Sequence, residues 1–589
     1  MYSTIYDFIT AEKVAYTKEV KLEDGWNWSM KAHLRRCFLI KNSQFLEENE
    51  NRYLRPNKNI VLAIANIAYR TEGFDVKDIE LYVNNIDKNY KSLIVRKYHD
   101  KWALENEIDT FIDDMVVSYH DYGGTLVRDT SQGRPEVIDL RAISFCNQHD
   151  ILSNPFGITH KMSFSDLRKA GKELGWGDTA KGATISIKDF IALLKKQDKK
   201  EAEVEEVHGW LPNEWLDDNT EMVDDTAEDT QQIQVVAYYK KENGDAQGVT
   251  LFKHAEPALP FKFLARDKIV DRALGRSGIE EQFESSAWTN WNEIKITEML
   301  EGASRQINLT DDPAIISSHP TGLKNLENHE FVKVADGKKG IWTMDTTPRN
   351  LAVFNDAVER WQAHAQQLGS ASEGMLGESP SSGTPFKLYK AQNILANGMH
   401  KYRQGQLAAF MDEIYRDFSL KHVSREIDND KDFLSELSAD EMLFVAKTVA
   451  TKRYNKTTKE IILSGQLADP SIKDAFIQKE IDDYLGEGNK RFFSIVKGDF
   501  KDHPLDVRTN IAGKQKNLAL MTDKVTNILR QFLITPQLRQ DPEMIKLLNV
   551  VLESSGMSPI MFGATPPQIQ QPQGTPQGTQ QLTPTMATA

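Results

Sequence analysis

Apolar side chains recur at helical spacing in two segments of the first third of the chain. Residues 60–68 are almost continuously apolar, and residues 107–119 repeat apolar side chains every three or four positions. Gly123 and Gly124 follow the second segment, and two glycines in succession end a helix. We therefore expect a helix over each segment.

Short runs of β-branched and other apolar residues, separated by turn formers, predict two β-hairpins. Residues 125–140 hold two such runs around Gly133, which can supply a positive φ angle. Residues 233–252 hold two more around Asn243-Gly244, a strong turn signal. The first part of the chain is thus expected to be mixed α and β.

Long helices are predicted from about residue 276 onward. Ser277 followed by Glu280 has the spacing of a capping box, and the apolar positions after it predict a helix over 276–306. A second helix is predicted over 347–369, where Thr-Pro begins it and Gly369 stops it. Aromatic side chains on the two helices are expected to anchor packing, in a core or at an interface: Phe283, Trp288, Trp291, Phe354 and Trp361.

The remaining C-terminal half divides into five further segments. Residues 307–346 contain short β-type runs between turn formers, and a small α/β insertion is expected there. Residues 370–383 are mostly small or turn-forming and predict a loop, which a long helix over 384–425 follows. Residues 426–562 are mostly helical by pattern, and the uncharged, Gln- and Pro-rich stretch 563–589 is expected to be disordered. The expected fold class is α+β, mainly helical.

The negative charge is concentrated in one stretch. The chain has 589 residues with 72 Lys+Arg and 86 Asp+Glu, a net charge of −14. Residues 201–229 contain twelve acidic residues and no Lys or Arg, which leaves −2 for the rest of the chain. A solvated, partly disordered insertion is the favoured interpretation of this stretch, and a docking site for a basic partner is the alternative.

No motif for catalysis, nucleotide binding or metal binding is present. The two cysteines, Cys37 and Cys146, are too few for a disulfide framework or a Cys-rich zinc site. Phosphate-loop, nucleophile-elbow and metalloprotease patterns are lacking. His364 and His400 are placed on helices with no acidic or nucleophilic partner nearby in the sequence, so we interpret them as surface or packed histidines. We expect no enzyme activity, no cofactor and no metal. The longest apolar run is too short for a membrane span, and the first residues do not have the pattern of a secretory signal.

The order of these segments resembles the portal protein of tailed bacteriophages. From Arg55 to Lys421 the chain has a mixed α/β region, a helix, a small insertion, a second helix, a glycine- and serine-rich loop and a long helix. Local sequences are similar to the family as well: Arg55-Pro56-Asn57-Lys58, Tyr122-Gly123-Gly124-Thr125, Gly133-Arg134-Pro135 and Leu274-Gly275-Arg276-Ser277-Gly278. The acidic stretch and the Gln/Pro-rich end depart from the family's pattern.

The resemblance implies a portal fold and a division of the chain. The parts would be a wing over 1–275 with the acidic insertion 201–229, stem helices over 276–306 and 347–369, a clip over 307–346, a tunnel loop over 370–383, a long wing and tunnel helix over 384–425, a helical crown over 426–562 and a tail over 563–589. The tunnel loop would face the channel through Glu373, Gly374, Met375, Leu376, Gly377, Glu378, Ser379 and Ser381. The clip would dock terminase or adaptor proteins through Lys333, Asp336, Lys338 and Lys339.

The resemblance also implies a function without catalysis. The chain would form a homo-oligomeric ring of twelve subunits at one vertex of the capsid, made in the host cytoplasm and retained in the virion, through which DNA is packaged and ejected. Its partners would be the major capsid protein, the large subunit of terminase, head-completion or adaptor proteins and tail proteins. Double-stranded DNA would pass without sequence readout. A nearly neutral body and a loop without Lys or Arg suit this role, because each grip on a phosphate would retard sliding.

Two other classes of function remain open from the sequence. Another head–tail adaptor or a scaffold-like ring protein of the virion could also be built from long helices. A nuclease or ATPase acting on DNA is a more distant alternative, because the chain lacks carboxylate clusters suited to two metals and a phosphate-binding loop.

Overall fold

The computed structural model divides the chain into two compact units. Unit 1 comprises residues 1–430 and 496–515, and unit 2 comprises 431–495 and 516–589. The structure describes residues 4–23, 25–43, 57–83, 99–130, 134–179, 182–216, 228–240, 246–304, 307–309, 342–344, 351–371, 375, 386–423, 439–464, 472–486, 505–509 and 530.

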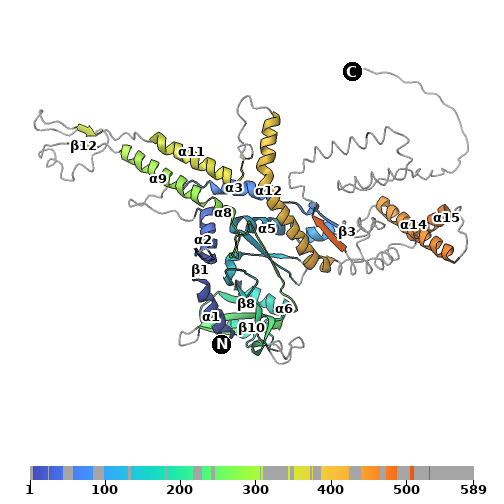
Figure 1. The fold of residues 1–589 in the computed structure, drawn as a ribbon. Coiled ribbons are helices and arrows are strands. Elements are labelled where there is room, and N and C mark those ends of the chain that lie inside the picture. Colours follow the sequence, from blue (N-terminus) through green and yellow to red (C-terminus); the bar gives the residue numbers. More distant parts are fainter. Residues whose placement is uncertain are drawn as a thin grey trace, which may run out of the picture. The chain divides into compact units, whose positions relative to one another are not determined.

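A five-stranded antiparallel sheet is the largest sheet of unit 1 (Figure 1). Its strand order is β10-β9-β8-β7-β6. The strands are β6 (Ile143–Phe145), β7 (Phe156–Ser163), β8 (Glu201–Pro212), β9 (Asp229–Lys240) and β10 (Ala246–Ala255). Successive residues of β9 point to opposite faces, so Val235 and Ala237 pack with one hydrophobic cluster and Val236 with another.

Helices cover one face of this sheet, and a second sheet packs with the other. Helices α6 (Phe164–Glu173) and α7 (Ile187–Lys196) bury apolar residues against β8, β9 and β10. On the opposite face, α1 (Ile5–Tyr16) and α2 (Met30–Lys41) share a cluster with a three-stranded antiparallel sheet. Its order is β11 (Phe261–Ala265), β4 (Gly124–Arg128) and β5 (Glu136–Ile138).

Helix starts in this region follow from the local sequence. Ser163 and Ser186 cap α6 and α7 by accepting the backbone N–H three residues later, as N-cap hydroxyls commonly do. Two expected helices are confirmed as α3 (Val61–Glu72) and α5 (Ile108–Tyr122), and Gly123 ends α5 with a φ of 83°. Both expected hairpins are confirmed, as β4–β5 and β9–β10.

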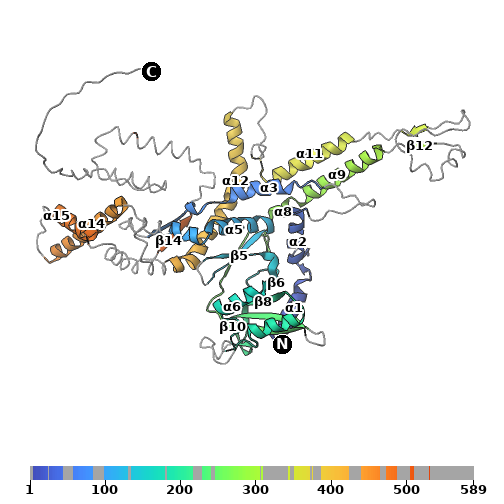
Figure 2. The same cartoon turned by 180° about the vertical axis from the view of Figure 1, so that it is seen from behind.

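The second half of unit 1 consists of helices joined to this body (Figure 2). They are the short α8 (Gly278–Glu281), α9 (Phe283–Ser304), α11 (Leu351–Leu368) and α12 (Phe386–Ile414), which a π-helical turn over Tyr415–Ser419 follows. The capping box at Ser277 is confirmed, although Gln282 separates α8 from α9. Strands β12 (Ile307–Leu309) and β13 (Trp342–Met344) pair antiparallel between α9 and α11.

One strand of unit 1 lies far along the chain. Strand β14 (Leu505–Thr509) pairs antiparallel with β3 (Ile79–Val83), although it lies in the range expected to be mostly helical. The described part of unit 2 consists of helices α14 (Ala439–Leu463) and α15 (Lys473–Gly486), which pack together through Tyr454 and Phe476. The remaining short elements are the strands β1 (Val20–Lys21) and β2 (Asn27–Trp28) and three 3-10 turns, at Val76–Asp78, Leu140–Ala142 and Asn213–Trp215.

The interpretation of residues 201–229 as a disordered insertion is wrong for its first part. Residues 201–212 form β8, because Ala202 and Val204 alternate with exposed acidic residues and pack into a core. Glu205 and Glu206 are buried in this strand and paired with cations. Residues 217–227 lie outside the described residues.

Candidate functional site

Helices α9 and α11 form an antiparallel hairpin with large aromatic side chains on its surface. The rings of Trp288 and Trp361 stack across the two helices with centroids 6.1 Å apart, and Trp291 meets Trp288 edge-on at 5.7 Å. Phe283, Trp288 and Trp291 are each more than 40% exposed. Three of the five aromatic residues expected to anchor the helices therefore face solvent, and Phe354 and Trp361 are half-buried.

The side of α9 that is buried in this chain is polar. Its buried residues are Ser285, Ser286, Thr289, Asn290 and Asn292. The Asn290 side chain accepts a hydrogen bond from the backbone N–H of Lys58 at 2.7 Å, and Ser285 lies 2.9 Å from the His364 ring on α11. An amphipathic helix normally buries its apolar face, so α9 has the reverse arrangement within one chain.

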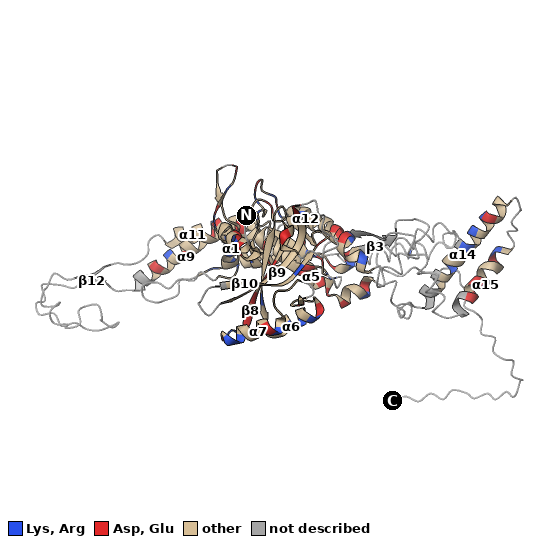
Figure 3. Ribbon diagram, turned by 90° about the horizontal axis from the view of Figure 1, so that it is seen from below, with Lys and Arg blue, Asp and Glu red and all other residues tan. Residues whose placement is uncertain are grey.

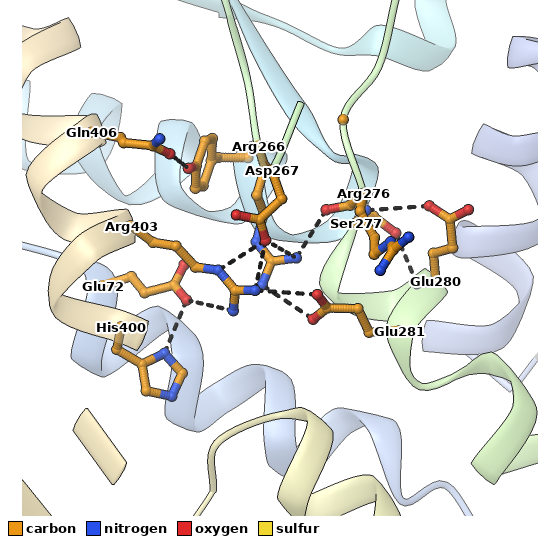
Figure 4. A network of polar contacts seen from close by, with 12 residues as sticks. Glu72, Arg266, Asp267, Arg276, Ser277, Glu280, Glu281, His400, Arg403 and Gln406 are labelled. Atoms are coloured by element: carbon orange, nitrogen blue, oxygen red, sulfur yellow. Dashed lines mark hydrogen bonds and ion pairs between the residues drawn. The ribbon is translucent and has the colours of Figure 1, made fainter. Parts of the chain in front are cut away.

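A buried network of charged residues lies where α3, α8 and α12 meet (Figure 4). Arg403 of α12 donates to Asp267 at 2.6 Å and to Glu281 of α8 at 3.1 Å, and its guanidinium lies 3.7 Å from Glu72 of α3. Arg266 lies 3.5 Å from the same Glu281. The network thus joins α8, which directly precedes the α9–α11 hairpin, to α12, the long helix that follows the hairpin in the sequence.

Burial and pairing act in opposite directions on the acidity of this network. Burial alone would raise the pKa of Glu72, but the hydrogen bond with His400 and the charge of Arg266 outweigh it and hold the pKa below its ordinary value. Burial would lower the pKa of Arg403, and the carboxylates of Glu281, Glu72 and Asp267 reverse that shift and raise it. The folded state therefore stabilises the charged forms of both side chains.

His400 is a packed histidine, as one of the two expectations had it, but it also has an acidic partner that is distant in the sequence. His400 is buried, and its Nδ1 lies 2.9 Å from Glu72 Oε1. The two residues are 328 positions apart in the chain, so no local pattern could have paired them. No local pattern marked Arg403 as a network residue either, because an isolated basic residue on a helix usually faces solvent.

Close contacts at both ends of the α9–α11 hairpin, where it joins the rest of unit 1, require glycine. A Cβ atom on Gly278, the first residue of α8, would lie 2.1 Å from Nε2 of His120 on α5. A Cβ atom on Gly369, after the last residue of α11, would lie 2.2 Å from a methyl carbon of Ile64 on α3. Both ends of the hairpin are therefore packed tightly on the α3–α5 layer.

A second buried charge cluster lies within the five-stranded sheet. His208 on β8 has both ring nitrogens against carboxylates, with Glu206 at 3.1 Å and Glu256 at 3.1 Å. Burial would lower the pKa of His208, but the two carboxylates raise it to about 9. Arg128 and His160 also bind Glu206, whose pKa lies well below its ordinary value although the side chain is buried.

Most of the residues expected to face a channel or dock partners lie outside the described residues. Of the expected loop residues only Met375 is described, in a turn and half-buried. Glu373, Gly374, Leu376, Gly377, Glu378, Ser379 and Ser381 are outside, and so are Lys333, Asp336, Lys338 and Lys339. The candidate site that the structure describes is thus the aromatic α9–α11 hairpin together with the buried charge network around Arg403.

The described residues offer no metal centre and no membrane helix. Within the described ranges, no three His, Cys, Asp or Glu side chains gather closely enough to hold a metal ion. Every helix in the same ranges is too short or too polar to cross a membrane. Cys37 and Cys146 are both free thiols, and burial raises the pKa of each to about 12.

Comparisons with known proteins give matches among solved structures only. No family model and no curated protein matches the chain. A chain described as "Virion of native gene transfer agent (GTA) particle" is 10% identical with a TM-score of 0.26, and the match covers 79% of this chain and 98% of that one. A chain described as "Neck of empty GTA particle computed with C6 symmetry" is 9% identical with a TM-score of 0.28, with 78% and 100% covered. Both TM-scores lie below 0.5, so neither likeness decides the fold or the function.

Proposed function

We propose that the chain is a structural subunit of a phage-like particle, specifically a portal subunit that assembles with identical copies into a ring around a DNA channel. The observation that carries the proposal is the α9–α11 hairpin, whose stacked aromatic side chains are exposed in a single chain. A two-helix hairpin with a small β module at its tip has the element order of a portal stem and clip.

The exposed aromatic face favours contact with further copies of this chain. A tryptophan side chain has an area of roughly 200 Å², so nearly half-exposed Trp288 and Trp291 together leave about 200 Å² open to water. Covering that area stabilises an interface by on the order of 5 kcal/mol before the entropy of association is subtracted. A contiguous apolar patch of this kind on a monomer commonly marks an interaction site.

The charge network around Arg403 fixes the start of the hairpin to the rest of unit 1, and the wall of a DNA channel needs such rigidity. Arg403 binds carboxylates from α8 and from the segment before it, so the hairpin and the long helix α12 are held to the same body. Residues 370–383, between these helices, would line the channel and touch DNA sterically. Residues 307–346 would meet the packaging motor and later the adaptor proteins.

Electron microscopy combined with mass measurement tests the proposal directly. The purified chain is expected to form rings, around twelve copies each, with a central channel and a protruding stem. Replacing Trp288 and Trp291 with Ser should lower ring formation at least tenfold while the melting temperature stays close to that of the parent. A matched control is Trp26→Ser, which removes an even more exposed tryptophan of the same unit away from the hairpin.

The other outcomes of this experiment distinguish the alternatives. Rings without a stem or a wide outer part would favour a head–tail adaptor over a portal. A chain that stays monomeric at high concentration, with scaffold and capsid proteins present, would refute the proposal. Mg²⁺-dependent cleavage of DNA or hydrolysis of ATP by the purified chain would favour an enzyme.

A further inference from the structure

Helices α6 and α7 form a groove with a basic rim and an apolar floor. The groove has a volume of about 570 Å³. Its floor consists of Trp176, Ile187 and Ile191, which are the outer edge of the cluster beneath the helices. Four basic side chains and no acidic one line it: Arg168, Lys172, Lys188 and Lys195. Ribbon coloured blue for Lys and Arg lies on α6 and α7 in Figure 3.

Helical spacing brings the basic side chains together over the floor. Arg168 and Lys172 are four residues apart on α6, and Lys188 and Lys195 lie on either side of Ile191 on α7. The acidic residues in the first turns of these helices, Asp166 and Asp189, are hydrogen-bonded to their own N-cap serines. The groove therefore presents positive charge around an apolar centre.

This pattern fits an acidic peptide with apolar side chains in its middle better than it fits a nucleic acid. A phosphate backbone offers charge but nothing apolar to cover Trp176 and Ile191. The chain itself contains a segment with the complementary pattern, residues 217–228 (DDNTEMVDDTAE). Met222 and Val223 have three acidic residues before them and three after them, with no Lys or Arg in the segment.

We propose that the α6–α7 groove binds residues 217–228 of a second copy of this chain. Met222 and Val223 lie on the apolar floor, and the flanking carboxylates pair with the four basic side chains of the rim. The contact rests on the self-association proposed above and adds a second interface, in the sheet region, to the one on the α9–α11 hairpin.

The reach of the segment favours a second copy over the same chain. The segment precedes Asp229, where β9 begins opposite Pro212. The groove floor packs above Val235 and Ala237, six to eight residues further along β9, or about 20–27 Å. Six residues from Val223 to Asp229 span at most about 22 Å when fully extended, before the helical layer is crossed. A segment from another copy has no such limit.

A peptide-binding experiment tests the groove. The probe is a labelled peptide with the sequence of residues 217–228, and the receptor is the full chain with the acids of its own 217–228 changed to Asn and Gln. We expect saturable binding that weakens at least tenfold when the rim is neutralised by Arg168→Gln, Lys172→Gln, Lys188→Gln and Lys195→Gln. A matched control loses the same charge on neighbouring exposed residues and should change binding less than twofold: Lys169→Gln, Lys196→Gln, Lys199→Gln and Lys200→Gln.

Three further results test whether the acidic peptide is what occupies the groove. A peptide with Met222→Ser and Val223→Ser should bind at least tenfold more weakly, and equal binding would overturn the proposal. Equal weakening by the rim variant and its control would overturn it too. So would a short DNA duplex that occupies the groove more tightly than the peptide and depends on the same rim.

Cross-linking between copies tests the second-copy origin. Copies with Lys188→Cys and differently tagged copies with Val223→Cys are mixed and oxidised, and we expect a disulfide product that carries both tags. A bond that forms only within a chain that carries both substitutions would overturn that origin. Rings that form without the cross-link would refute this contact and leave the portal proposal standing. Peptide binding by a chain that forms no rings would support the groove and refute the portal proposal.

Discussion

Replacing Arg403 with Met should destabilise unit 1 more than any single charge removed from its surface. The guanidinium lies 2.6 Å from Asp267, 3.1 Å from Glu281 and 3.7 Å from Glu72, and it is almost fully buried. Methionine keeps most of the aliphatic stem but leaves Glu281 and Asp267 with only the longer Arg266 contacts, at 3.5 and 3.9 Å, and leaves Glu72 with His400.

The expected loss is about 3 kcal/mol, at the lower end of the usual 3–5 kcal/mol for a buried pair that loses one partner. The lower end applies because the Asp267 side chain is 24% exposed and retains some hydration. Changing Asp267 to Asn as well removes one of the uncompensated charges. The double variant should therefore lose at least about 1 kcal/mol less than the sum of the two single changes.

Hydrogen exchange of α12 peptides across a urea series is the suitable assay, because the chain has two compact units and only unit 1 contains the network. The matched control is Lys401→Met, a substitution of an exposed basic residue on the same helix. If Arg403→Met and Lys401→Met shift the stability of α12 by the same amount within about 0.5 kcal/mol, the network does not hold the helix. Strict additivity with Asp267→Asn would likewise contradict direct coupling.

Three further predictions concern buried polar and glycine positions of unit 1. His208 has a folded pKa of about 9 against an ordinary 6.5, so its contribution of on the order of 3 kcal/mol is complete below pH 6.5 and is lost as the pH rises through 9. Melting temperatures measured from pH 6 to pH 10 should fall for the parent and less for His208→Gln, and parallel curves would refute this. Gly278→Ala should cost about 1–3 kcal/mol by forcing His120 aside, and a circular dichroism melt like that of the parent would show that the contact relaxes freely. Tyr415→Phe should cost about 1–3 kcal/mol because the buried His99 loses the hydroxyl 2.9 Å from its Nε2, and an unchanged melt would mean that another group replaces it.

Local elements were predictable from the sequence where the evidence is local. The hairpins β4–β5 and β9–β10 depend on turn residues between apolar runs, and helix α11 ends at Leu368 because Gly369 follows. The apolar spacing of α9 correctly predicted a helix. It did not predict which face is buried, because Asn290 finds its partner in Lys58, more than 200 residues earlier.

Buried charge was the part that the sequence obscured. The acidic run suggested a solvated loop, yet Glu206 is buried beside Arg128, His160 and His208. The alternation of Ala202 and Val204 with acidic residues indicates a strand. The high density of acidic residues around them nevertheless favoured the prediction of a solvated loop. The Glu72–Arg403 contact depends on elements that only the tertiary fold brings together.

The pairing of β14 with β3 has a mechanical consequence. The chain passes from unit 1 into unit 2 after residue 430 and returns to unit 1 at residue 496, before β14. A chain cut at residue 430 would lose more than unit 2, since it would also expose the edge of β3 in unit 1. The backbone hydrogen bonds between Leu505–Thr509 and Ile79–Val83 would resist tension applied to the chain beyond β14. Because the two strands are antiparallel, whether those bonds open one by one or must shear together depends on the direction of the pull.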